Sequence, residues 1–238
     1  MLSSSCARPT AAPTPHPFYP SPHAARAVAI APQLEGINWL LACWHARRST
    51  ILADEMGLGK TCQLLLTLQW LVEHRKLHGP FLIVAPVSTL GHWQREVLRW
   101  TRLSCVVLHG PADARRSLLN TEGRHSDVHG RATGRRRYHV LITAPDSFTA
   151  ELSALSALPW QYLIVDEAHR LKNPHTKLYR ALTSLRTRHC TLLTGSTRTE
   201  DGPPPPTVPP RRLHSLAIAV PPAPTSSAPL PRPSRSLH

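Results

Sequence analysis

The sequence contains no C-x-x-C pair, no long apolar run and few acidic residues, and each absence excludes a class of protein. Its five cysteines are widely spaced, which argues against a disulfide framework or a zinc site and is typical of buried thiols in a reducing compartment. The longest apolar run, residues 64–72, is interrupted by Thr67 and Gln69 and is too short to span a bilayer. The first residues also lack the apolar core of a secretory signal. We therefore expect a soluble, intracellular protein with no membrane segment.

Acidic side chains are outnumbered along the chain. Lysine and arginine together number 28 against 14 aspartates and glutamates, which gives a formal charge of +14. Such an excess is expected of a protein that binds a polyanion, although a nucleotide alone would explain part of it. The charge therefore suggests a polyanionic partner without identifying it.

Both ends of the chain lack tryptophan and are rich in proline. Residues 1–27 contain six prolines and residues 196–238 contain twelve, whereas all six tryptophans lie between Trp39 and Trp160. Proline-rich segments without aromatic residues cannot bury enough apolar surface to offset the entropy lost on ordering. We predict disordered tails at 1–27 and 196–238 and one domain at 28–195, which is a normal size for a single core.

Within that domain, short apolar runs alternate with helical patterns. The predicted strands are Thr50–Ala53, Phe81–Ala85, Cys105–Leu108, Val140–Thr143, Tyr162–Val165 and Thr191–Thr194. The predicted helices begin at Thr61 and at Ser88 and cover Asp113–Leu119, Asp146–Leu155 and Thr176–Leu185. Continuous apolar strands that alternate with helices predict an open α/β fold with a mostly parallel sheet. The arginine-rich segment Thr121–Arg137 has no periodicity and is either a solvated loop or a contact for a phosphate backbone.

One glycine-rich stretch, Ile51–Thr61, combines a short apolar run, a glycine turn and the start of a helix. Gly57 and Gly59 would let successive backbone N–H groups face one anion, and the helix dipole would add positive potential. Lys60 would neutralise phosphates and the Thr61 hydroxyl would bind Mg²⁺, as in a phosphate-binding loop. Asp54 stands where the general motif has its first glycine, so a glycine-rich turn with a surface lysine remains the alternative.

A second pattern, Tyr162–His169, is an apolar strand that ends in Asp166 and Glu167. In a phosphate-loop ATPase such an aspartate holds Mg²⁺ beside the phosphate loop, and the adjacent glutamate activates the attacking water. A strand with a charged cap is the alternative for these two residues alone. Their order after the glycine-rich loop, on an alternating α/β pattern, makes nucleotide hydrolysis the leading hypothesis.

The motifs also resemble those of one family, the Swi/Snf-related chromatin-remodelling ATPases of helicase superfamily two. Its chromodomain-helicase-DNA-binding branch is the most similar. In that family an aspartate at the position of Asp54 is normal. The segments that carry the resemblance are Gln33–Leu40, Asp54–Thr61, Ala85–Leu90 followed by Trp93, and Asp166–Asn173. The resemblance implies a RecA-like lobe flanked by helices, which uses ATP and Mg²⁺ to move along DNA on nucleosomes in the nucleus.

The resemblance further implies a role for each matching residue. Lys60, Asp166 and Glu167 would be catalytic, and Thr61 and Asp166 would hold the metal. The residues that would contact ATP are Gln33 (through adenine), Asp54, Glu55, Met56, Gly57, Leu58, Gly59, Lys60, Thr61 and His169 (which would couple the nucleotide to the next motif). DNA would lie along Pro86, Ser88, Thr89 and Thr143, although Ala144-Pro145-Asp146 departs from the family's usual sequence after that threonine.

The similarity to the family ends after Gly195, where proline-rich sequence follows. Family members have a second RecA-like lobe whose arginines can contribute about 10³–10⁵ in rate, so we expect this chain to bind Mg-ATP weakly and hydrolyse it barely. Two alternatives stay open. One is a truncated isoform or fragment that binds nucleotide or DNA without remodelling, and the other is a DEAH-type RNA helicase.

Overall fold

Six short strands form one parallel sheet in the computed structural model, which describes residues 31–53, 59–121 and 137–194. Along the chain the strands are β1 (Thr50–Leu52), β2 (Phe81–Val84), β3 (Cys105–Leu108), β4 (Val140–Thr143), β5 (Tyr162–Val165) and β6 (Cys190–Leu193). Their order in space is β1-β6-β5-β2-β4-β3, and every neighbouring pair is parallel. The predicted parallel α/β fold is therefore confirmed.

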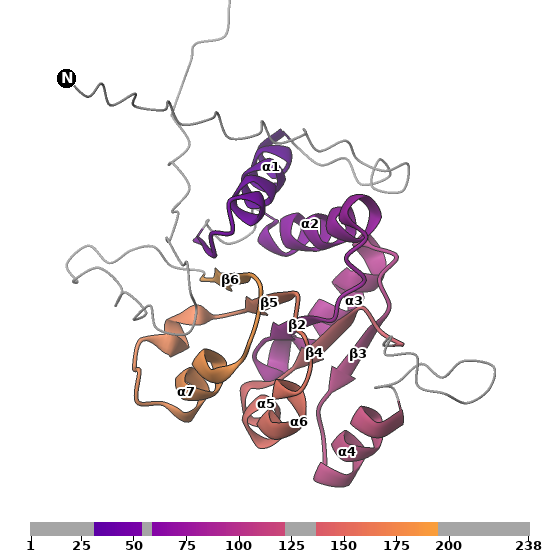
Figure 1. Cartoon of the computed structure of the whole chain (residues 1–238), viewed down its shortest axis with the longest axis vertical. Coiled ribbons are helices and arrows are strands. Elements are labelled where there is room, and N and C mark those ends of the chain that lie inside the picture. Colours follow the sequence, from indigo (N-terminus) through magenta and orange to yellow (C-terminus); the bar gives the residue numbers. More distant parts are fainter. Residues whose placement is uncertain (1–30, 54–58, 122–136, 195–238) are drawn as a thin grey trace, which may run out of the picture.

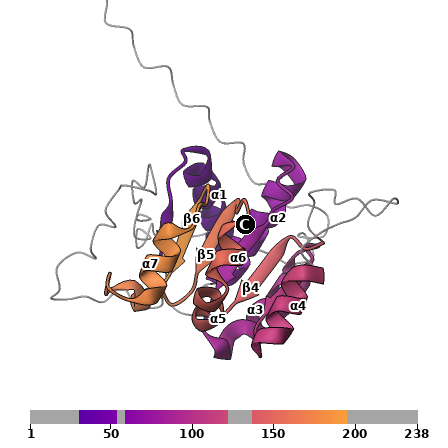
Figure 2. The ribbon, with the colours of Figure 1, turned by 60° about the horizontal axis from the view of Figure 1, so that its bottom comes forward.

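Helices cover both faces of this sheet (Figures 1 and 2). The first layer consists of α1 (Ala31–His45), α2 (Lys60–Arg75) and α3 (Leu90–Trp100). The second layer consists of α4 (Ala112–Thr121), α5 (Pro145–Ala150), α6 (Leu152–Ser156) and α7 (Lys177–Ser184). Two short 3₁₀ helices, η2 (Val87–Thr89) and η3 (Ala168–Leu171), follow β2 and β5 directly.

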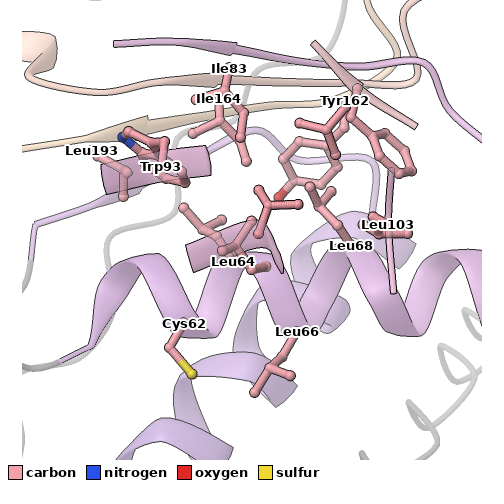
Figure 3. Close-up of a cluster of buried hydrophobic side chains, with 14 of the residues drawn as sticks. Cys62, Leu64, Leu66, Leu68, Ile83, Trp93, Leu103, Tyr162, Ile164 and Leu193 are labelled. Carbon is pink, nitrogen blue, oxygen red and sulfur yellow. The ribbon is translucent and has the colours of Figure 1, made fainter. Parts of the chain in front are cut away.

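Each layer has its own apolar core because side chains along a strand alternate between the two faces. In β2, Phe81 and Ile83 belong to the cluster on the first layer, whereas Leu82 and Val84 belong to the cluster on the second. Figure 3 shows the first cluster, in which Leu64 and Leu68 of α2 point toward the sheet. Burial on both faces explains why the strands read as unbroken apolar runs.

The predicted strands agree with the observed strands to within one residue, but the helix predictions need three corrections. Helix α1 was not predicted as an element, although Ile37, Leu40 and Leu41 are fully buried at helical spacing along it. The single helix expected at Asp146–Leu155 is two short helices that meet at Glu151, whose φ of −102° and ψ of 17° lie outside the helical range. Helix α2 starts at Lys60, one residue earlier than expected.

A chain of three buried hydroxyl groups joins the edge strand β1 to the sheet interior. The Thr191 Oγ1 atom lies 2.8 Å from Thr50 Oγ1 and 2.7 Å from the Tyr162 hydroxyl. Burial raises the pKa of Tyr162, so this hydroxyl keeps its proton for the chain. Because β1 leads into the glycine-rich loop, these bonds help to fix where that loop begins.

Three of the four described cysteines are buried, as predicted for ordinary thiols, and all four are free. Burial raises the pKa of Cys62 to about 11 and that of Cys190 to about 12. None of the helices in the described ranges has the length and apolarity of a membrane span. The predicted tails and residues 122–136 of the arginine-rich segment lie outside the described residues.

Candidate active site

The glycine-rich motif and the acidic motif both follow strands at the carboxyl edge of the sheet. Strand β6 pairs with β1 on one side, with Leu193 opposite Leu52, and with β5 on the other, with Leu192 opposite Val165. The residues that follow β1 and β5 therefore leave the sheet at nearly the same level. One strand lies between them, so the two chain segments are separated by two strand spacings, about 10 Å. Both motifs are therefore within reach of one bound triphosphate.

Of the glycine-rich loop, Gly59 and the start of α2 are described, whereas Asp54, Glu55, Met56, Gly57 and Leu58 lie outside the described residues. Gly59 has a left-handed backbone, with φ 78° and ψ 28°, and directly precedes the helix. A Cβ atom at this position would lie 2.6 Å from Gln33 Nε2. Both the backbone angle and the close side chain therefore require glycine here.

Lys60 and Thr61 form the first turn of α2, a helix of 16 residues. The first N–H groups of a helix have no partner within it and carry the positive end of the helix dipole. Both residues are half-buried. This combination favours an anion with several oxygen atoms, such as a phosphate chain.

Helix α1 brings Gln33 to the end of the same loop. The Gln33 side chain lies against Gly59, and one turn further along α1 the Gly36 backbone lies against the Gln63 side chain of α2. A side chain on Gly36 would collide with Gln63, so this glycine permits the close packing of the two helices. The sequence prediction named Gln33 and Gly59 separately, and the structure places them in contact.

Asp166 is held by three hydrogen bonds at the end of β5. Its backbone N–H donates to the Val84 carbonyl of β2, at 2.8 Å. Its Oδ1 atom accepts from the Glu167 backbone N–H and its Oδ2 atom from the Trp93 indole N–H, each at 2.9 Å. The carboxylate therefore has a fixed orientation before any ligand arrives.

In the sequence analysis Trp93 belonged to a segment that resembles the family, and it was given no role of its own. It is 1% exposed, as a core residue should be, yet its one polar atom bonds to a carboxylate 73 positions away. A general signal was available, because a buried tryptophan N–H needs a hydrogen-bond acceptor. That signal does not name the acceptor, which depends on the order of the strands.

Glu167 follows in a left-handed conformation, with φ 52° and ψ 50°, which is uncommon for a residue with a side chain. Its Oε2 atom lies 2.9 Å from His169 Nδ1 in η3. The two side chains are 33% and 54% exposed, so both can reach a ligand at the edge. The left-handed backbone at Glu167 turns the chain from β5 into η3.

The residues predicted to face DNA lie at the same edge but differ in exposure. Ser88 is exposed in η2, Pro86 and Thr89 are half-buried, and the Thr89 hydroxyl donates to the Pro86 carbonyl at 3.0 Å. Thr143 is 0% exposed and its hydroxyl donates to the Leu108 carbonyl of β3 at 2.9 Å. The Thr143 hydroxyl is thus used within the sheet, and it would have to break its bond to the Leu108 carbonyl before it could contact DNA.

The donor groups at this edge suit Mg²⁺ together with a phosphate chain. The Thr61 hydroxyl and the Asp166 carboxylate are oxygen ligands, which Mg²⁺ prefers. Within the described ranges no group of three or more histidine, cysteine, aspartate or glutamate residues could hold a metal ion by itself. A metal here would take its remaining ligands from phosphate and water, which is the usual arrangement for Mg²⁺ with a nucleotide.

Comparison with known families and proteins agrees with this geometry. The family described as SNF2-related domain matches residues 32–200. Human chromodomain-helicase-DNA-binding protein 7 is 43% identical to this chain over 165 residues. Mouse chromodomain-helicase-DNA-binding protein 6 has the same identity over the same length. Human chromodomain-helicase-DNA-binding protein 8 is 42% identical over the same length. Each alignment covers 69% of this chain, which spans about 6% of the length of these relatives.

A solved structure shares the fold. The SWI2/SNF2 ATPase core of Sulfolobus solfataricus, determined in complex with double-stranded DNA, superposes with a TM-score of 0.57. The superposition covers 78% of this chain and 34% of that protein, at 24% sequence identity. At this identity the likeness supports the RecA-like fold of the ATPase core and no finer conclusion.

Proposed function

This chain belongs to the SNF2-related family of ATPases, and we propose that it is the ATP-binding lobe of a DNA translocase that remodels chromatin. The observation that supports this most directly is the shared carboxyl edge. There, β1, which leads to Lys60 and Thr61 at the start of α2, is separated by one strand from β5, which leads to Asp166 and Glu167. These four side chains are of the types that phosphoryl transfer to water requires.

Lys60 and Thr61 would bind the phosphate chain. The Lys60 ammonium neutralises the terminal phosphates, and the N–H groups of the first turn of α2 donate to their oxygens. Gln33 lies against Gly59 at the end of this loop, and from there it would contact the adenine ring. The first turn of α2 and Gln33 of α1 thus hold the two ends of one nucleotide.

Asp166 and Glu167 would act in the hydrolysis step. Mg²⁺, when bound with ATP, neutralises the charge that develops on the phosphate oxygens. Asp166 would orient that ion through its fixed carboxylate, and Thr61 would add its hydroxyl. Glu167 would accept a proton from the attacking water, and His169, 2.9 Å from its Oε2 atom, would hold the glutamate in place.

The partner of the complete protein would be the backbone of duplex DNA on nucleosomes, in the nucleus. Three observations support this: the names of the relatives, the formal charge of +14, and the exposed Ser88 at the same edge as Asp166. A short hydroxyl side chain suits a phosphate contact that positions the protein without reading sequence. Since the chain spans about 6% of those relatives, remodelling itself is proposed only for the whole protein.

Binding of a fluorescent ATP analogue to the full 238-residue chain tests the proposal. Lys60→Ala should weaken binding by about tenfold or more, because hydrogen bonds to charged groups contribute about 1.5–3 kcal/mol. Lys177→Ala, which removes an exposed lysine at the start of α7, is the matched control and should bind like the wild type. The proposal fails if the wild-type chain does not bind the analogue, or if the two variants weaken binding equally.

A further inference from the structure

The Trp93 indole donates a hydrogen bond to the carboxylate of Asp166. The Nε1–Oδ2 distance is 2.9 Å, and Trp93 is 1% exposed. Figure 3 shows Trp93 beside Leu193, with its ring nitrogen at the end of the indole that points away from α2. A neutral donor thus reaches the candidate metal ligand from inside the core.

A second tryptophan shows what a purely structural indole looks like in this fold. Trp160 is also 1% exposed, but its Nε1 atom donates to the Leu155 backbone carbonyl at 2.8 Å, five residues away. It lies just before β5, at the opposite end of the strand from Asp166. A buried indole N–H in this fold can therefore be satisfied by a backbone carbonyl and does not need a carboxylate as its acceptor.

The two hydrogen bonds to Asp166 act on different oxygens. The Glu167 backbone N–H holds Oδ1 and the Trp93 indole holds Oδ2, so together they fix the plane of the carboxylate. Each oxygen keeps a second acceptor position, because a carboxylate offers about four lone-pair sites. The carboxylate is thus oriented without being saturated, as a metal ligand must be.

We propose that Trp93 is a positioning residue, which orients Asp166 toward Mg²⁺ and so sets the affinity of the site for Mg-ATP. The inference rests on the proposed function, since it needs an ATP site at this edge. Groups that orient metal ligands typically change metal affinity by about 10–100-fold when they are removed. Trp93 also stands in α3, which follows η2 directly, so it links that 3₁₀ helix to the metal ligand.

The first experiment measures binding of ATP to the full chain across a series of Mg²⁺ concentrations and in EDTA. Mg²⁺ should enhance ATP binding, and Trp93→Phe should raise about tenfold the Mg²⁺ concentration at which this enhancement is half-maximal. ATP binding in EDTA should stay unchanged. Trp160→Phe, the matched control, should leave both quantities unchanged. In an Asp166→Asn background Trp93→Phe should have no further effect, because the two residues act through one interaction.

The second experiment does not depend on the folding of a tryptophan variant. In the chain labelled with ¹⁵N-tryptophan, Asp166→Asn should shift the indole resonance of Trp93 and leave that of Trp160 in place. The positioning role is wrong if that resonance does not move, or if both tryptophan variants change the Mg²⁺ requirement equally. If the wild-type chain does not bind ATP, the proposed function fails instead, and the role of Trp93 fails with it.

Discussion

The helical layer of α1, α2 and α3 and the layer of α4, α5, α6 and α7 each bury an apolar cluster against the same sheet, but they contribute differently to the candidate site. Gln33, Lys60, Thr61 and Trp93 all come from the first layer. None of the predicted nucleotide-binding residues in the described ranges comes from a helix of the second layer. The second layer therefore contributes to the core of the fold and supplies no predicted nucleotide-binding residue from its described helices.

The two fully buried tryptophans show the same contrast at single-residue level. Trp93 of the first layer donates to Asp166, whereas Trp160, packed in the second cluster, donates to a backbone carbonyl. Both hydrogen bonds satisfy a buried N–H group, and only one of them reaches a functional side chain. Variants matched in this way can separate stability from function.

The largest effect should come from truncating one leucine in each layer. Leu64 of α2 and Leu155 of α6 are both 0% exposed, and Leu→Ala at such positions lowers the free energy of unfolding by about 2–5 kcal/mol. Urea denaturation should therefore show similar losses for Leu64→Ala and Leu155→Ala. Only Leu64→Ala should also weaken ATP binding, measured at a temperature where both variants are folded, because α2 carries Lys60.

Equal weakening of ATP binding by both variants would contradict the separation of the layers. It would mean that the second layer also positions the phosphate-binding residues. Unchanged binding in Leu64→Ala would show instead that the first turn of α2 keeps its place without the leucine below it.

A smaller effect is expected at the other end of the sheet, where His189 precedes β6 and stacks against Tyr162. Burial lowers the pKa of His189 to about 4, from an ordinary value of 6.5. Between these values the unfolded chain binds a proton that the folded chain does not, so stability is lost as the pH falls from 6.5 toward 4. The loss should reach about 3 kcal/mol at pH 4.

His189→Phe should flatten this dependence, because phenylalanine keeps an aromatic ring against Tyr162 and does not titrate. Some slope should remain, since burial, with a smaller effect of His78, also lowers the pKa of His139. His175→Phe, at an exposed histidine, is the matched control and should retain the full slope in urea denaturation. A slope unaffected by His189→Phe would show that other groups cause the acid sensitivity.

How much could be predicted from sequence depended on how far apart the interacting residues lie. The six strands and the Lys60–Thr61 helix start follow from local apolar runs and a glycine, and they were predicted to within one residue. The position of β6 between the two motif strands depends on the order of strands across the sheet, which no local pattern specifies. The bond between Trp93 and Asp166 depends on the same order and could not be predicted for that reason.

For other site residues the sequence named the residue but not its contacts. Glu167 and His169 were predicted as separate contributors, and their close contact follows from the left-handed turn at Glu167. Thr143, the last residue of β4, was predicted to face DNA because it matches a threonine of the family, but its hydroxyl donates to the Leu108 carbonyl within the sheet. Strand ends alone do not tell which side chains reach the surface.

The central claim is that a metal ion binds with ATP beside Asp166, and Mn²⁺ in place of Mg²⁺ tests it most directly. Both ions accept oxygen ligands, and bound Mn²⁺ broadens nearby proton resonances steeply with distance. Trp160 precedes Asp166 by six residues along an extended strand, about 20 Å, whereas the Trp93 indole bonds to Asp166 itself. In the ¹⁵N-tryptophan-labelled chain, low amounts of Mn-ATP should erase the Trp93 indole resonance first and leave that of Trp160. Equal broadening of both resonances, or loss of Trp160 first, would contradict the account.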